Sequence, residues 1–225
     1  VTPEEIFELA EEYFGGIEAQ EPPQAIRTTE PEQLGARRLL VEVDAPTPLL
    51  HMTFHAGSAT DPETLAMSVL LHILVGGNSS RLHRSFVENE QIALAVDGFQ
   101  MEGIDPGLVY FYLTLPPDAD LAGAERRLLE ELDRIAVEGV SDAELKKAQN
   151  IMSANYWRGM STIDGKASAI GNAEVFLGDY QRAFALPEEL AAVSTEDIQG
   201  IARKVFDHRK MTVGILRAAQ TEGTQ

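Results

Sequence analysis

The spacing of apolar residues along the chain predicts helices that run in blocks, separated by short strands. Apolar positions three or four residues apart are typical of a helix with one buried face. This spacing predicts helices over residues 2–14, 61–75, 121–139, 141–160, 167–176, 188–192 and 194–206. Alternating or β-branched runs predict strands over residues 37–43, 49–56, 92–101, 108–115 and 210–216. Because strands pair locally and helices run together, we expect an α+β fold in which helices cover one face of an antiparallel sheet.

Capping signals support several of these helices. The sequences at residues 2–5 and 141–144 predict capping boxes, in which the cap side chain and the third helical residue satisfy each other's free backbone N–H groups. Residues 194–197 predict a third capped start. The first and last of these helices are faintly alike, and shared helix chemistry explains the likeness as well as a repeat does. The matching residues are Glu4, Ile6, Ala10 and Phe14 with Glu196, Ile198, Ala202 and Phe206.

Composition divides the chain into three expected parts. Residues 1–36 are interpreted as a capping helix and a Pro-rich, solvent-facing linker, residues 37–217 as the α+β domain, and residues 218–225 as a flexible tail. The start, Val-Thr-Pro-Glu-Glu, has neither an initiator Met nor the apolar core of a signal peptide, which is compatible with a fragment of a longer protein.

Charge and composition exclude several classes of protein. The net charge of −18 argues against nucleic acid and anionic membranes as partners, because both bind clustered Lys and Arg. No run approaches the ~20 apolar residues that cross a bilayer, so a soluble protein is expected, with cytoplasm and periplasm both left open. The absence of cysteine excludes disulfides and thiolate chemistry. Residues 1–35 hold nine Glu and one Arg, which suits a solubilising face or, alternatively, the attraction of basic peptides.

The histidines do not form a recognisable metal site. His51 and His55 have the spacing that places two imidazoles on one zinc ion in a helix. Here they lie in a strand, where four residues span ~13 Å, against the ~4 Å that separates two zinc-bound nitrogens. His72, on the apolar helix, is interpreted as a satisfied core or interface histidine. We therefore expect no catalytic residues and no metal ligands in this chain.

A glycine break divides two helices in the middle of the chain. Gly76 and Gly77 follow an apolar helical run, where a left-handed backbone favours glycine, and Ser79 or Ser80 is expected to cap the helix that follows. Free N–H groups in such a loop can also cradle an anion, but a plain turn between helices is the preferred interpretation.

The same break carries a family resemblance. Gly-Gly-Asn-Ser-Ser-Arg-Leu at residues 76–82 resembles a segment of the pitrilysin/insulinase family of zinc peptidases, which includes the mitochondrial processing peptidases. Residues 105–108, 138–145 and 197–198 are similar to family members too, so the resemblance covers roughly residues 37–217. It implies a processing-peptidase-like fold of two related halves facing each other across a chamber. One half binds zinc through His-x-x-Glu-His, and the C-terminal half lacks this motif.

The chain resembles the half that does not bind zinc. No His-x-x-Glu-His occurs in it, and the segment that aligns loosely with the motif reads Ser68-Val-Leu-Leu-His72. Zinc is therefore expected in a partner half and not in this chain. Active relatives place an Arg and, seven residues on, a Tyr against the substrate; by register these positions are Val87 and Leu94, so those roles are not transferred. Substrate contact is instead expected at Ser79, Ser80 and Arg81.

Two functions follow from the resemblance. The first is a non-catalytic half or partner subunit of a zinc metalloendopeptidase, which closes the chamber and binds the peptide substrate beside a zinc-bearing homologous half. The alternative is a catalytically dead structural or peptide-binding subunit of an assembly.

Overall fold

The computed structural model describes residues 2–21, 30–44 and 46–218. By backbone contacts the chain divides into two compact units, Val1–Glu32 and Gln33–Gln225. The part of the linker prediction that falls on residues 22–29 lies outside the described residues, as does the tail prediction from residue 219 on.

In the part of the first unit that the structure describes, there is one helix, α1 (Pro3–Phe14), which begins as its capping signal predicts. The hydroxyl of Thr2 accepts a hydrogen bond from the N–H of Glu5, and the Glu5 carboxylate accepts one from the N–H of Thr2. No residue of α1 is buried.

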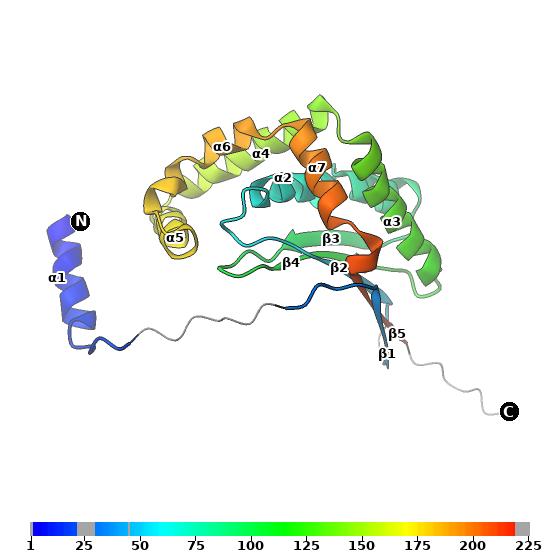
Figure 1. Cartoon of the computed structure of the whole chain (residues 1–225), viewed down its shortest axis with the longest axis horizontal. Coiled ribbons are helices and arrows are strands. Elements are labelled where there is room, and N and C mark those ends of the chain that lie inside the picture. The colour runs from blue at the N-terminus through cyan, green and yellow to red at the C-terminus, as the bar shows by residue number, and fades with distance from the viewer. Residues whose placement is uncertain (1, 22–29, 45, 219–225) are drawn as a thin grey trace. The chain divides into compact units, whose positions relative to one another are not determined.

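The described residues of the second unit form one mixed sheet of five strands (Figure 1). The strands are β1 (Arg37–Val43), β2 (Leu49–His55), β3 (Ala95–Gln100), β4 (Leu108–Thr114) and β5 (Met211–Ala218). Their order in space is β1-β5-β2-β4-β3, and every neighbouring pair is antiparallel except β1 and β5, which are parallel.

Helices of this unit lie on one side of the sheet, as Figure 1 shows. The α-helices are α2 (Thr64–Val75), α3 (Leu121–Glu138), α4 (Asp142–Met160), α5 (Ile163–Asn172), α6 (Leu186–Ala192) and α7 (Thr195–Val205). Short π-helical segments are η1 (His83–Asn89) and η2 (Ala173–Leu177), and 3₁₀ turns are η3 (Tyr180–Phe184) and η4 (His208–Lys210). The α+β class and the helix-covered face are confirmed.

The core lies between α2 and the helix-facing side of β2 and β4. Leu50, Met52 and Phe54 alternate with half-exposed residues along β2, so one side chain in two enters the core. Phe111 does the same from β4, and most residues of α2 are buried, as its uniformly apolar sequence predicts. Among the described residues, no helix is long and apolar enough to cross a membrane.

Strand β1 differs from the others because all seven of its residues are exposed. It forms one edge of the sheet and is held by its parallel pairing with β5 and by an ion pair to α3. In that pair the guanidinium of Arg38 donates to both carboxylate oxygens of Glu125, at 2.5 and 2.7 Å. Its leucines therefore indicate a strand but not a buried one.

Candidate functional site

The glycine break forms a sharp turn at the C-terminal end of α2. The N–H of Gly76 closes the helix by donating to the carbonyl oxygen of His72 at 2.9 Å. Gly77 follows with φ of +89°, in the left-handed region that side chains with a Cβ rarely occupy. The turn returns the chain toward α4.

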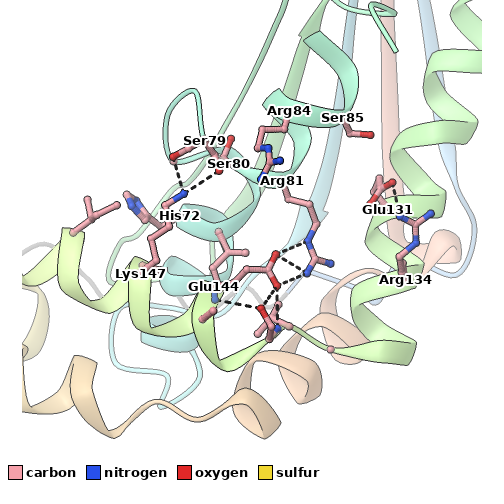
Figure 2. A pocket seen from close by; sticks show the side chains of 18 of the residues that line it. His72, Ser79, Ser80, Arg81, Arg84, Ser85, Glu131, Arg134, Glu144 and Lys147 are labelled. Carbon is pink, nitrogen blue, oxygen red and sulfur yellow. Dashed lines mark hydrogen bonds and ion pairs between the residues drawn. The ribbon is translucent and has the colours of Figure 1, made fainter. Parts of the chain in front are cut away.

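Two polar contacts fasten this loop to α4 (Figure 2). Arg81 forms a bidentate pair with Glu144, in which Nη2 lies 2.8 Å from both carboxylate oxygens. The ammonium group of Lys147 donates to the carbonyl and hydroxyl oxygens of Ser79, at 3.0 and 2.7 Å. Two of the three residues expected to touch substrate therefore hold the loop on α4.

Ser79 and Ser80 do not cap the following helix, so that prediction is wrong. Leu82 occupies the cap position of η1, and no side chain bonds to its free N–H groups. The hydroxyl of Ser79 is engaged by Lys147, whereas the Ser80 hydroxyl is buried and has no hydrogen-bond partner. The helix that follows is π-helical rather than α-helical, a form often found at functional sites.

A cavity of about 740 Å³ opens beside this loop, between α2, η1, α3 and α4. Its lining includes His72, Ser80, Arg84, Arg134 and Lys147, as Figure 2 shows. The Nε2 atom of His72 is buried and has no hydrogen-bond partner, so the expectation of a satisfied histidine is wrong. Burial, and then the charge of Lys147, lower the pKa of His72, which keeps its imidazole neutral.

The pair between Arg81 and Glu144 should contribute measurably to stability. Their side chains are 21% and 33% exposed, which places the pair between a surface ion pair and a buried one. We expect a double-mutant cycle of Arg81→Met and Glu144→Gln, followed by urea unfolding, to give a coupling energy of about 1 kcal/mol. Gln at position 144 preserves the capping box with Ser141, so the cycle separates the pair from the cap. A coupling energy of zero would show that the loop is held by other contacts.

A second group of charges ties the end of η1 to α3. Arg127 donates to Glu90 at 2.7 and 2.9 Å and also to Oε1 of the buried Glu131 carboxylate, an oxygen that accepts a hydrogen bond from Arg134 as well. The hydrogen bonds from Arg127 lower the pKa of Glu90 from 4.5 to about 2, against the opposing effect of burial.

This lowered pKa predicts a loss of stability in acid. Below pH 4.5 the unfolded chain binds a proton at Glu90 before the folded chain does, so the contribution is present above 4.5 and is lost as the pH falls toward 2. We expect the Tm of the parent chain to fall more steeply between pH 5 and pH 3 than that of the Glu90→Gln variant. The reason is that the variant has no carboxyl group at position 90 to take up a proton. Parallel curves of Tm against pH for the two proteins would mean that solvent screens the pair between Glu90 and Arg127.

The face of the sheet opposite the helices carries a band of aromatic rings. Register places His51 opposite Tyr112, and Phe99 opposite Tyr110, on the same face. Phe99 stacks on Tyr110 with ring centroids 4.8 Å apart. The rings of His51 and Tyr112 lie nearly perpendicular to each other, with centroids 4.2 Å apart. We call these four residues the aromatic band. Burial lowers the pKa of His51, so the band carries no charge of its own at neutral pH.

The surroundings of the aromatic band are mostly apolar. Phe99 remains 45% exposed, and Leu39 on the same face of β1 is 63% exposed. Asp97, which lies opposite Tyr112 in the register, supplies a carboxylate at the border of the band. Among the described residues of the five strands, this face carries only two side chains that are charged at neutral pH, Asp97 and Arg37. The alternation of residues along the strands could have indicated the aromatic band, because every second residue of β2, β3 and β4 lies on this face.

Val87 and Leu94, the positions that the family resemblance aligns with a substrate-holding Arg and Tyr, are apolar and lie apart from the cavity lining. Val87 packs partly buried against the core, and Leu94, just before β3, is 55% exposed. The described residues contain no group of three or more His, Asp or Glu side chains placed to hold a metal ion. His51 is half-buried and His55 exposed on β2, so the side chains present do not fit a zinc site.

Comparison with known proteins identifies relatives of this chain. The family description "Peptidase M16 inactive domain" matches residues 1–152. The "Uncharacterized zinc protease" of Streptomyces coelicolor is 27% identical over 150 residues, which cover 67% of this chain and 32% of that protein. "Cytochrome b-c1 complex subunit 2, mitochondrial" of Rattus norvegicus is 26% identical over 172 residues, covering 72% of this chain and 38% of that protein.

Solved structures share the fold. A protease from Helicobacter pylori matches with a TM-score of 0.89 at 19% identity, covering 96% of this chain and 53% of that one. A peptidase M16 inactive domain from Pseudomonas fluorescens matches with a TM-score of 0.83 at 14% identity, covering 97% of this chain and 52% of that one. The chain spans between 32% and 49% of the length of the curated relatives it matches.

Proposed function

The chain belongs to the family of the peptidase M16 inactive domain, and on that premise we propose that it is a non-catalytic half or partner subunit of a zinc metalloendopeptidase. In this role it closes one side of the reaction chamber and holds the peptide substrate against a zinc-bearing homologous half. It performs no hydrolysis itself, since its described side chains provide neither a metal site nor a base beside one.

The observation that carries the peptide-binding role is the helix-free face with its aromatic band. An exposed apolar surface on an otherwise acidic chain marks a place of contact rather than of solvation. Half-exposed aromatic rings bind apolar side chains by stacking, and cationic side chains by attraction to the ring faces. Asp97 beside the band adds a carboxylate for a basic residue. Edge strand β3, which contributes Phe99, also offers unpaired backbone groups to an extended peptide.

Within the proposed role, each group of this chain acts by placement. When bound in the partner half, zinc supplies the Lewis acid that polarises the scissile carbonyl and activates water. The aromatic band and the edge of β3 would hold the peptide extended, while Ser79, Ser80 and Arg81 stay as proposed contacts at the loop. Because Arg81 and Ser79 are already bonded to α4, substrate contact there would use their remaining donors or exchange these bonds.

A second function, a structural subunit without peptidase activity, is favoured by one observation. Val87 and Leu94 remove the polar clamp that active relatives use, so the chain lacks the side chains through which such a half assists cleavage. One protein with a similar sequence, from Rattus norvegicus, bears the name of a subunit of the cytochrome b-c1 complex.

Peptide binding by the chain alone tests the proposed surface. Fluorescence anisotropy of a long, unstructured, fluorescein-labelled peptide containing Lys, Leu and Phe should show binding. Phe99→Ala and Tyr112→Ala should each weaken it about threefold to tenfold, because each removes one ring from the contact. Trp157→Ala is the matched control, since Trp157 is 60% exposed but lies on α4 in the helix layer. Equal affinity in the parent and both face variants, all with unchanged Tm, would place the peptide elsewhere.

A further inference from the structure

The cavity beside the glycine break contains buried polar atoms to which the described residues offer no hydrogen bond. Ser80 lines the cavity and is only 4% exposed, and its hydroxyl has no partner. The Nε2 atom of His72, which enters the same lining from α2, is buried and unpartnered as well. A hydroxyl and an imidazole nitrogen buried in this way destabilise a fold unless another group completes their hydrogen bonds. The cavity therefore has the polar interior of a binding site.

Two cationic side chains lie beside these atoms (Figure 2). Arg84 follows Ser80 by one helical turn, and its N–H donates to the Ser80 carbonyl oxygen, so both side chains lie on the same side of the helix. Among the residues that the structure describes, the Arg84 guanidinium has no hydrogen bond and no ion pair. Lys147 uses two of its three N–H groups on Ser79, the neighbour of Ser80. Both cations therefore keep donors that a ligand in the cavity can use.

The carboxylates of the cavity lining do not neutralise these cations. Glu131 and Glu144 are each held by arginine side chains, which leaves Glu138, at the end of α3, as the one lining carboxylate without a partner among the described residues. Arg84 and Lys147 thus give the cavity an excess of positive charge. The chain as a whole carries 36 acidic against 18 basic side chains, so this excess is a local property of the cavity. A concave, positively charged site with buried donors suits a small anion.

We propose that this cavity binds the phosphate group of a small molecule. Arg84 and Lys147 supply the charge, and the Ser80 hydroxyl donates to a phosphate oxygen. The neutral imidazole of His72 can carry its proton on Nε2 and donate a further hydrogen bond. Donors from four separate side chains suit the three terminal oxygens of a phosphate better than the two oxygens of a carboxylate.

The size of the cavity bears on the rest of the ligand. Its volume of about 740 Å³ is far larger than a phosphate group, so the remainder of the molecule has room in the cavity too. The aromatic band lies on the opposite face of the sheet, and the inference does not depend on the proposed peptide role.

Titration of the full chain with sodium phosphate at constant ionic strength, followed by amide NMR, tests this site. The amide signals of Gly76, Gly77 and Ser80 should shift and saturate with a Kd of about 1 mM. Arg84→Met should raise this Kd about tenfold, because it removes a charge-assisted contact. Arg126→Met is the matched control, since it removes the same charge from α3 outside the cavity lining and should leave the Kd unchanged.

Two further samples separate binding from folding and phosphate from other anions. Ser80→Ala should raise the Kd about threefold to tenfold without lowering the Tm, because its hydroxyl supports no other residue. Sodium acetate at the same ionic strength should cause much smaller shifts in the parent chain. Shifts with acetate as large as those with phosphate would assign the site to carboxylates and overturn the proposal. Shifts that do not saturate, or an equal Kd in the parent and Arg84→Met, would mean that water completes these hydrogen bonds and would overturn it as well.

Discussion

Replacing Gly76 with valine should lower the stability of the chain by about 2–3 kcal/mol, a fall in Tm of about 5–10 °C. A Cβ at this position would collide with the carbonyl oxygen of His72 and lie 2.6 Å from its Nδ1 atom. The carbonyl does not move freely, because it accepts the hydrogen bond that closes α2. Thermal melts at neutral pH measure the change.

Gly77 provides the comparison that separates crowding from backbone strain. Its φ is +89°, yet a Cβ there would meet nothing within 4 Å. Gly77→Val should cost about 1–2 kcal/mol from backbone strain alone, whereas Gly77→Asn should cost less, since Asn tolerates the left-handed region. A Gly76→Val protein that melts with the parent would contradict the contact geometry at the end of α2.

Local signals explain why most elements could be predicted from the sequence. The capping boxes at Thr2 and Ser141 and the capped helix start at Ser194 form as expected, because each joins residues only three apart. The positions of β2 and β4 could be predicted because core-facing and outward-facing residues alternate along each strand. The prediction for β3 began three residues early, at Ile92, because Ile92 and Ala93 are apolar yet turn back to the carbonyl of Phe86.

Contacts between distant residues explain what could not be predicted. Arg81 meets Glu144 across 63 positions, and nothing in the local sequence pairs them. The parallel pairing of β1 with β5 joins the two ends of the domain, and a strand pattern does not reveal direction. The aromatic band also depends on register, because Phe99, Tyr110 and His51 come together only when three strands align.

The largest functional effect is expected when the chain meets a zinc-bearing half. In the proposed role, an open chamber would leave an extended peptide free to move, whereas a second wall would restrict it to orientations in which its scissile bond faces the zinc-bearing half. Holding the substrate in the right orientation can lower the activation barrier by several kcal/mol. We expect a smaller reduction here, because Val87 and Leu94 stand where the resemblance places a polar Arg and Tyr. We therefore expect the mixture to cleave a long unstructured peptide about tenfold faster than the zinc-bearing half alone. Phe99→Ala should reduce this gain by raising KM more than it lowers kcat, because it removes binding rather than chemistry.

Cleavage of that peptide by three samples tests the proposed role most directly: this chain alone, the zinc-bearing half alone, and the two mixed, each with metal analysis after dialysis. The proposed role predicts that this chain alone holds no stoichiometric zinc and cleaves nothing, and that mixing raises the rate. A stable complex without any gain in rate would favour the structural subunit instead. Cleavage by this chain alone, abolished by a chelator and accompanied by about one zinc ion per chain, would contradict a non-catalytic half.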